Sequence, residues 1–398
     1  MMKRCFLVIL DGVGVGELPD ADAYGDSGSA TLPNVAEAVG GLSLPNLQQL
    51  GLGNIVPVRG VPPADNPGAF YGKLNEQSAG KDSTTGHWEI AGIITEKPFP
   101  LYPGGFPDDI VQEFIDRTGC GGILGNEPAS GTEIISRLGK EHMETGYPIV
   151  YTSADPVFQV AAHEHIVPLE RLYEWCEIAR YEIMTGDHAV SRVIARPFVG
   201  EPGAFERTDN RKDFSFEPPR KTLLDNLTDH NVFTMTIGKV DNLFAGRGIQ
   251  KYVHTKNNTI GIEKLIDTVR NLDGGFVFTN LVDFDQEYGH RNDPDGFARA
   301  LEEFDKAVPA IMGALRDDDL LIVTSDHGND PTTPGSDHSR EYAFLLAYIK
   351  GMTEGRDVGV RATFADIAQT YAEYFSLPPD VRSRMDGESF YSEFQKVV

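Results

Sequence analysis

Cysteine is scarce in this chain of 398 residues. The three cysteines, Cys5, Cys120 and Cys176, lie far apart, their number is odd, and no pair has the CxxC spacing. This pattern excludes a disulfide framework and a zinc site built from thiolates. It is typical of a reducing compartment, and we expect a cytoplasmic protein.

Positive charge and long apolar runs are also lacking. The chain has 35 Lys and Arg residues against 60 Asp and Glu residues, a formal net charge of -25. Such an acidic protein lacks the basic face that nucleic acid or an anionic membrane requires, so we expect neither as a partner. No segment approaches the roughly 18 consecutive apolar residues of a membrane span.

What the chain does have is apolar segments that run directly into acidic residues. Three of them are typical of strands buried on both faces: 5–10 before Asp11, 275–282 before Asp283 and Asp285, and 320–325 before Asp326. Amphipathic helices are predicted at 261–272, before the second of these strands, and at 297–315, between the last two. Strands that alternate with helices indicate an α/β fold, with a mostly parallel sheet and helices on both faces. Ligands bind such sheets at the carboxyl ends of the strands.

The middle of the chain has a different composition. Residues 98–107 and 200–219 are rich in proline and glycine and bracket the segment between them. That segment contains predicted strands at 149–153 and 193–195 and a predicted helix at 169–184. It is typical of a smaller α/β domain inserted into a larger one.

We therefore predict two domains. The core comprises residues 1–99 and 217–398, and the inserted cap domain comprises residues 100–216. The core is predicted to close with a strand at 343–349 and a helix that a capping box, from Thr363 to Asp366, introduces.

The polar residues near the predicted strand ends combine carboxylates with imidazoles: Asp11, Asp285, His290, Asp326, His327 and His338. Asp and His together suit Zn, Mn or Fe, whereas Mg and Ca prefer oxygen ligands alone. Taken singly, such a residue more often caps a helix. Their convergence on one edge of one sheet favours a metal site, and six groups are enough for two ions.

The segment SAGKDSTTGHWEIAG, residues 78–92, places the hydroxyls of Ser83, Thr84 and Thr85 side by side. Such hydroxyls usually bond backbone N–H groups at a helix start. An alcohol becomes a nucleophile once a base or a metal removes its proton. Two ions about 3.5–4 Å apart can do this while they clamp a phosphoryl group. The residues thus favour phosphoryl transfer and leave open which hydroxyl reacts.

Long motifs along the whole chain resemble those of the phosphopentomutase family, of the alkaline phosphatase superfamily. They are DGVGVGE from Asp11, GKDSTTGHWE from Gly80, PASGTE from Pro128, YTSAD from Tyr151, ARPFVGEPG from Ala195, NLVDFDQEYGHRND from Asn280 and SDHGNDPTTPGSDHSREY from Ser325. The resemblance implies an alkaline-phosphatase-like core and interconversion of ribose 1-phosphate, or its 2-deoxy analogue, and the 5-phosphate. It also implies two Mn²⁺ ions per chain, with Zn or Mg as alternatives, a phosphorylated enzyme hydroxyl and a sugar bisphosphate activator.

The same resemblance implies roles for the individual site residues. It places Asp285, His290 and His338 around one ion, and Asp11, Asp326, His327 and the nucleophile around the other. The family's usual nucleophile is the Thr directly after Lys-Asp, where this chain has Ser83. Serine carries the same hydroxyl, so we assign the nucleophile to Ser83, with the adjacent Thr84 and Thr85 as alternatives.

Basic residues are the candidates for holding the distal phosphate of a sugar, because Arg makes bidentate bonds to phosphate oxygens. The candidates are Arg192, Arg196, Arg207, Arg211 and Lys239. The resemblance places Arg192 and Lys239 at substrate contacts. Arg207 and Arg211 are either further contacts or surface charges paired with the excess of acids.

The resemblance also places Ser153 and Asp155 at contacts with sugar hydroxyls. His87, beside the nucleophile, is expected to pack and position its neighbours rather than to bind a metal. His163 and His165 alternate on a predicted strand, and we expect a structural role for both.

The resemblance implies phosphopentomutase activity, that of an isomerase that acts on a small phosphorylated sugar. The alternatives within the same superfamily are a phosphoglycerate mutase and a metal-dependent phosphomonoesterase, which would share the metals and differ in the cap contacts. A protein that binds metal without catalysis is the third alternative. The oligomeric state and the choice between ribose and deoxyribose stay open.

Overall fold

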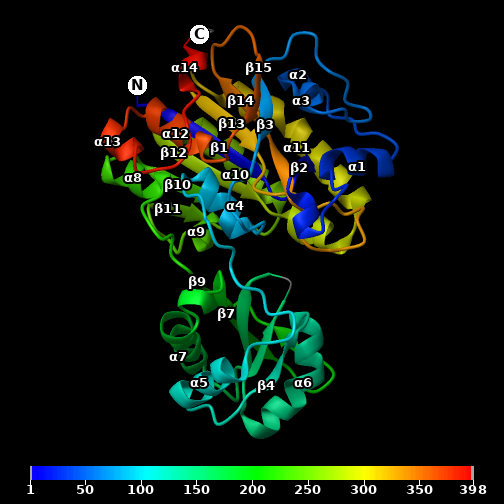
Figure 1. The fold of residues 1–398 in the computed structure, drawn as a ribbon, viewed down its shortest axis with the longest axis vertical. Coiled ribbons are helices and arrows are strands. Elements are labelled where there is room, and N and C mark those ends of the chain that lie inside the picture. The colour runs from blue at the N-terminus through cyan, green and yellow to red at the C-terminus, as the bar shows by residue number, and fades with distance from the viewer. Residues whose placement is uncertain (1, 154, 396–398) are drawn as a thin grey trace. The chain divides into compact units, whose positions relative to one another are not determined.

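The computed structural model describes residues 2–153 and 155–395 (Figure 1). The chain divides into two compact units. Unit 1 comprises Met1–Pro98 and Pro218–Val398, and unit 2 comprises Phe99–Glu217. Among the described helices, none is both long enough and apolar enough to cross a membrane. The catalytic role predicted for the core and the covering role predicted for the insert stay predictions.

A nine-stranded sheet forms the centre of unit 1, in the order β11-β10-β12-β1-β13-β14-β3-β15, with β2 paired to β14. The strands are β1 (Arg4–Leu10), β2 (Gly14–Glu17), β3 (Phe70–Leu74), β10 (Thr234–Ile237), β11 (Lys251–Val253), β12 (Gly275–Leu281), β13 (Leu320–Thr324), β14 (Glu341–Ile349) and β15 (Asp357–Arg361). From β11 to β13 all neighbours are parallel, and β14 runs antiparallel to the strands it contacts. The sheet is therefore mostly parallel, as predicted.

Helices cover both faces of this sheet. One face packs against α1 (Thr31–Ala38), α2 (Pro45–Leu50), α3 (Leu52–Ile55), α10 (Asn258–Asn271) and α11 (Pro294–Ala314). The other carries α4 (Ser83–Ile90), α8 (Leu223–Asp229), α9 (Val240–Leu243) and α12 (Asp366–Tyr374), with α13 (Pro379–Arg382) and α14 (Tyr391–Phe394) beside α12. On this second face Tyr371 packs edge-on against Phe276, with ring centroids 5.0 Å apart. The predicted α/β fold class is confirmed.

The order of the strands decides where the polar residues meet. β1 lies between β12 and β13, and all three are parallel. In this register Ile9 pairs with Asn280 on one side and with Thr324 on the other. The segments that begin at Asp11, Val282 and Ser325 therefore leave the sheet at one edge.

Unit 2 has its own sheet, in the order β4-β5-β6-β7-β8, with β9 paired to β7. Its elements are α5 (Asp108–Thr118), β4 (Leu124–Pro128), α6 (Gly131–Thr145), β5 (Ile149–Thr152), β6 (Val157–His163), α7 (Leu169–Ile178), β7 (Arg192–Val199), β8 (Glu206–Arg207) and β9 (Lys212–Ser215). α5 and α7 pack against one face, and α6 packs against the other. The helix predicted at 169–184 ends at Ile178, and a π-helical turn, Ala179–Ile183, continues it.

The capping box predicted at Thr363 and Asp366 is wrong. α12 follows Ala365, and no side chain caps its first turn. The hydroxyl of Thr363 donates to the carboxylate of Glu89, and the carboxylate of Asp366 is paired with Arg361. Thr363 is thus engaged by a residue distant in sequence and Asp366 by a residue outside the helix, and the reciprocal bonds of a capping box do not form.

A buried ion pair ties the start of β1 to the rest of unit 1. The guanidinium of Arg4, 1% exposed, bonds the carboxylate of Asp319 and the carbonyls of Val269 and Leu272. Arg4→Met leaves Asp319 buried without its partner, which destabilises a fold by about 3–5 kcal/mol. Calorimetry should show the melting temperature lowered by about 5–10 °C.

The exposed pair of Arg59 and Glu37 is the matched control for this prediction. Exposed ion pairs contribute about 0–1 kcal/mol, so Arg59→Ala should change the melting temperature by no more than about 2 °C. Equal shifts of the melting temperature for Arg4→Met and Arg59→Ala would show that burial does not determine how much the Arg4 pair contributes to stability.

Candidate active site

All six predicted metal ligands come together in unit 1. Ligand atoms lie within 4.8 Å of one another in two groups, Asp285 with His327 and His338, and Asp11 with Asp326 and His327. The sixth residue, His290, has its Nε2 3.3 Å from Oδ2 of Asp285. The convergence follows from the sheet, because each segment leaves a parallel strand at the same edge.

Neighbouring amides hold one oxygen of each carboxylate. The bonds run from Nδ2 of Asn280 to Asp11 (2.7 Å), from Nδ2 of Asn329 to Asp285 (2.6 Å) and from the backbone N–H of Gly12 to Asp326 (3.2 Å). The sequence analysis did not single out either asparagine. Asn280 could have been recognised from the sequence, because it is a polar residue near the end of a mostly apolar strand. All seven residues of that strand are buried.

Burial and the mixture of charges set the ionisation of this cluster. Burial and then Asp326 raise the pKa of Asp11. Burial also acts to raise the pKa of Asp285, but His338 and His290 outweigh it and hold that pKa well below its usual value. The cluster thus needs positive charge to keep its carboxylates ionised.

Several buried atoms of the cluster make no well-oriented hydrogen bond to the described residues and face only another ionisable side chain of the site. They include Oδ1 of Asp11, Oδ2 of Asp326 and Nε2 of His338. Buried polar atoms without partners are costly and rare in folded proteins. These atoms are carboxylate oxygens and an imidazole nitrogen, the ligands that Mn, Fe and Zn accept. The residues therefore fit a divalent metal centre.

Among the three adjacent hydroxyls, that of Ser83 lies at the cluster. Its Oγ is 3.0 Å from Nε2 of His327. Asp82 is the N-cap of α4 and accepts from the backbone N–H groups of Thr84 and Thr85. It also accepts from the hydroxyl of Thr85, at 2.7 Å. The cap thereby aims Ser83 at the cluster and engages Thr85 elsewhere.

The loop that leads to Ser83 is fixed from two sides. Arg340, two residues after His338, donates to the carboxylate of Glu76 and to the carbonyls of Ser78 and Gly80. The backbone N–H of Ser78 donates to the carboxylate of Glu89, which is fully buried. No local pattern in the sequence indicates this role of Arg340, because only the folded chain brings it to the loop.

Two other predicted residues of unit 1 lie beside the cluster. Nδ1 of His87, a buried side chain, is 2.8 Å from the carbonyl of Ser83 and 3.0 Å from Oδ2 of Asp326. His87 therefore contacts both the residue that carries the hydroxyl and a predicted ligand, as expected of a positioning group. Lys239 donates to Gln286, the chain neighbour of Asp285, at 2.9 Å.

In unit 2, the predicted residues Arg192 and Arg211 share Asp213 as a partner, and Arg192 also contacts Asp155. Arg192 lies 3.6 Å from Asp155 and 3.7 Å from Asp213. Arg211 makes two bonds to Asp213, of 2.6 and 2.7 Å. Arg207 is exposed on the short strand β8.

Ser153 directly follows β5, and Ala154 of the YTSAD motif lies outside the described residues. His163 is buried in β6, and its ring contacts backbone groups at Gly200 and His165. These contacts fit the structural role expected of His163 and His165.

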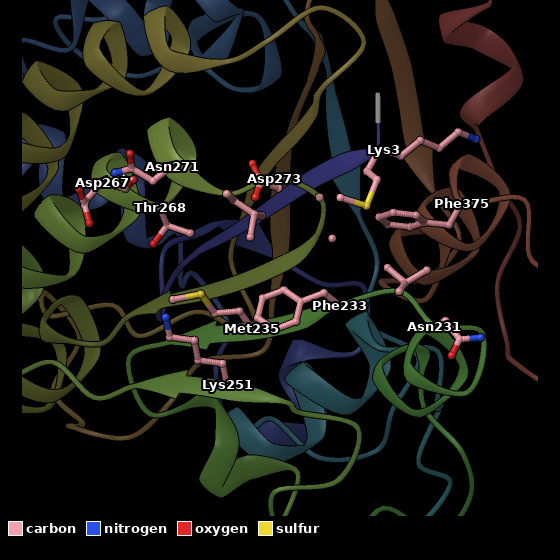
Figure 2. A pocket seen from close by; sticks show the side chains of 15 residues that line it. Lys3, Asn231, Phe233, Met235, Lys251, Asp267, Thr268, Asn271, Asp273 and Phe375 are labelled. Carbon is pink, nitrogen blue, oxygen red and sulfur yellow. Dashed lines mark hydrogen bonds between the residues drawn. The ribbon is translucent and has the colours of Figure 1, made fainter.

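A cavity of about 670 Å³ lies elsewhere in unit 1. Figure 2 shows its lining, which includes Lys3, Phe233, Lys251, Asp273 and Phe375. It adjoins the amino ends of β1, β10 and β12, whereas the metal-ligand cluster lies at the carboxyl ends of β1, β12 and β13. The cavity is therefore separate from the candidate active site.

Comparisons with known proteins agree with this chemistry. Residues 3–379 match the family model of the Metalloenzyme superfamily, which makes the chain a metalloenzyme. A phosphopentomutase from Dictyoglomus thermophilum is 55% identical over 395 residues, 99% of either chain. One from Caldanaerobacter subterraneus is 58% identical over 379 residues, 95% of this chain and 96% of that protein. One from Acetivibrio thermocellus is 55% identical over 389 residues, 98% of this chain and 99% of that protein. The chain belongs to the phosphopentomutase family.

Proposed function

We propose that this enzyme interconverts ribose 1-phosphate, or 2-deoxyribose 1-phosphate, and the 5-phosphate through a phosphoenzyme on Ser83. The observation that carries the proposal is the position of the Ser83 hydroxyl, 3.0 Å from His327 within the cluster of carboxylates and imidazoles. A hydroxyl beside such a cluster suits nucleophilic phosphoryl transfer.

Asp285, His290 and His338 would hold one Mn²⁺ ion, and Asp11, Asp326, His327 and Ser83 would hold the other. Zn or Mg would suit several of these ligands as well. When bound, such ions lower the pKa of a coordinated hydroxyl and stabilise negative charge on phosphoryl oxygens.

The chain's own groups then account for the transfer. A sugar bisphosphate that gives one phosphate to Oγ of Ser83 would start the cycle. The free hydroxyl of the sugar monophosphate then attacks this phosphorus, the bond from phosphorus to Oγ breaks, and a sugar bisphosphate results. Oγ of Ser83 next attacks the other phosphate of that bisphosphate, the bond from phosphorus to the sugar oxygen breaks, and the phosphoenzyme is restored. In each step the proton of the attacking hydroxyl is released and the departing oxygen takes up a proton, so the steps balance. The first turn of α4, where Ser83 lies, favours negative charge.

We assign substrate recognition to residues of both units. Arg192 and Lys239 are proposed to hold the phosphate that does not react, with Arg207 and Arg211 as further contacts, and Ser153 and Asp155 to bind sugar hydroxyls. Unit 2 would act as a cap that keeps water from the phosphoenzyme. We also propose a cytoplasmic location, which the three free cysteines support, and no nucleic-acid or membrane partner, which the net charge of -25 supports.

Phosphorus NMR of the purified protein tests this function. With Mn²⁺ and a sugar bisphosphate, the signal of ribose 1-phosphate should be replaced by that of ribose 5-phosphate. Omission of either should slow the conversion. Release of inorganic phosphate alone would indicate a phosphomonoesterase, and turnover of phosphoglycerate alone a phosphoglycerate mutase. The absence of any turnover would contradict an enzymatic role.

Arg192→Ala and Lys239→Ala should each weaken the mutase reaction selectively. Loss of one charged hydrogen bond to phosphate should lower kcat/KM for ribose 1-phosphate by about 10- to 100-fold. Hydrolysis of a small aryl phosphate, which has no second group to hold, should change little. Lys140→Ala, an exposed residue of α6, is the control. An equal loss of kcat/KM on both substrates would contradict the role assigned to Arg192 and Lys239.

A further inference from the structure

The first turn of α6 in unit 2 presents backbone N–H groups without acceptors. Ser130 is the N-cap of this 15-residue helix, and its side chain makes no cap bond. Ile134 donates to the carbonyl of Ser130, as expected one turn into the helix. Among the described residues, none accepts from the N–H groups of Gly131, Thr132 and Glu133. These groups and the helix dipole favour an anion at this end.

A buried hydroxyl without a partner points to the same place. Tyr151 of β5 is fully buried, and its Oη has no hydrogen-bond partner among the residues that the structure describes. A Cβ on Gly131 would lie only 2.6 Å from this Oη, so the hydroxyl lies against the first residue of α6. Burial raises the pKa of Tyr151, which keeps the group a donor at neutral pH. A donor left unpaired in a buried position needs an explanation.

Guanidinium groups lie near this hydroxyl. The register pairs Tyr151 with Gln159, and Nε of Arg196 donates to Gln159 at 3.0 Å. Nη1 of Arg207 is 3.7 Å from the position of the same Cβ on Gly131. Arg196, Arg207 and the nearby Arg211 all oppose the effect of burial on the pKa of Tyr151, as nearby positive charges do.

The charges of this group do not balance. Arg211 is neutralised by its two bonds to Asp213. Arg196 and Arg207 have no carboxylate partner within 4.0 Å among the described ion pairs. Two positive charges therefore remain together in a chain whose net charge is -25. Burial and then Arg211 lower the pKa of Arg196 to about 10, which fits a crowded group of cations.

We propose that the first turn of α6, the hydroxyl of Tyr151 and the guanidinium groups of Arg196 and Arg207 bind the phosphate group of a phosphate monoester. The site gives the PASGTE motif a function and adds the α6 turn and Tyr151 to the contacts assigned above. It rests on the proposed function, in which substrate and activator are both phosphate monoesters. A dianion would accept from the open N–H groups, from the buried hydroxyl and from Arg in bidentate fashion.

Hydrogen exchange read by mass spectrometry tests the site in the full, metal-loaded chain. Ribose 5-phosphate should slow exchange of the amides in the first turn of α6, whereas ribose should not. A parallel titration with ribose 1,5-bisphosphate shows whether the site prefers the substrate or the activator. The preferred ligand should protect this turn at the lower concentration. Absence of protection by both phosphates would overturn the proposal.

Two substitutions sharpen the test. Tyr151→Phe removes one donor and retains the ring, so protection should need about tenfold more ligand. Gly131→Ala puts a methyl group against Oη of Tyr151 and should weaken binding at least as much. Lys140→Ala, on the same helix, should leave the titration unchanged. Wild-type titration curves for both Tyr151→Phe and Gly131→Ala would exclude the site, provided that their circular dichroism spectra match the parent protein.

This outcome can be separated from that of the proposed function. Protection of α6 with ribose 5-phosphate does not require turnover, so it would persist if the mutase assay failed. Normal mutase turnover with unchanged KM in Tyr151→Phe and Gly131→Ala would instead sustain the function and overturn the site.

Discussion

Replacing Ser83 by alanine should abolish both the phosphoenzyme and the mutase reaction. Of the three adjacent hydroxyls, that of Ser83 lies 3.0 Å from Nε2 of His327, whereas that of Thr85 is bonded to Asp82. Loss of a covalent nucleophile commonly lowers kcat by about four orders of magnitude or more. Intact-mass measurement after treatment with a sugar bisphosphate should show no added phosphate in Ser83→Ala, and the NMR assay should show no conversion.

The neighbouring hydroxyls provide the matched controls. Thr84→Ala and Thr85→Ala should keep most of the activity and the added phosphate. Ser83→Thr should also stay active, since threonine offers the same hydroxyl at the same helix start. Retained turnover in Ser83→Ala, with loss of turnover in Thr84→Ala or Thr85→Ala, would assign the nucleophile to another residue.

Asp326→Ala should remove a metal ion and nearly all activity while the fold persists. Oδ2 of Asp326 and Oδ1 of Asp11 lie in one group of ligand atoms with His327, which points to shared coordination of a cation. In the metal-free protein, moreover, Asp326 raises the pKa of Asp11 through repulsion. Asp326 also contacts the buried His87 and accepts from the backbone N–H of Gly12, so its removal should lower the melting temperature of the apoprotein moderately while the fold persists.

Metal analysis and thermal unfolding measure both parts of this prediction. Added Mn²⁺ should raise the melting temperature of the parent protein, because a ligand that binds the native state stabilises it. The rise should be much smaller for Asp326→Ala and for Asp285→Ala. Asp283→Asn is the control, because the carboxylate of Asp283 accepts from the backbone of Asn258 and lies outside the ligand groups. Full metal content in both alanine variants would show that the ligand assignment is wrong.

The sequence was most informative where a local pattern decides the structure. The apolar segment before Asp11 predicts a buried strand, and β1 extends over it as Arg4–Leu10. Because parallel strands deliver their following residues to one edge, the meeting of Asp11, Asp285 and Asp326 was predictable as well. The local pattern of apolar residues and the parallel arrangement of the strands suffice for such predictions.

Features that depend on tertiary register were not predictable. Arg340 reaches Glu76 and the loop up to Gly80 across more than 250 positions of sequence, and no local pattern indicates such a bond. The failed capping box at Thr363 has the same origin, since the carboxylate of Glu89 takes the hydroxyl that would have capped the helix. A buried acceptor elsewhere in the fold outweighed a local preference there.

The choice among the three adjacent hydroxyls was predictable only in part. The residues alone left Ser83, Thr84 and Thr85 as candidates, and the resemblance to a family indicated Ser83. In the structure, Asp82 caps α4 and leaves Ser83 directed at His327. A capping residue one position earlier thus explains which hydroxyl is available for chemistry.

Locating the phosphate on the unmutated protein tests most directly the claim that a single serine carries the transferred group. The Mn-loaded enzyme is treated with an isotopically labelled sugar bisphosphate and digested, and the label is assigned to a residue by mass spectrometry. We predict label on Ser83 and none on Thr84 or Thr85. Label on either threonine, or mutase turnover without any covalent label, would contradict the account.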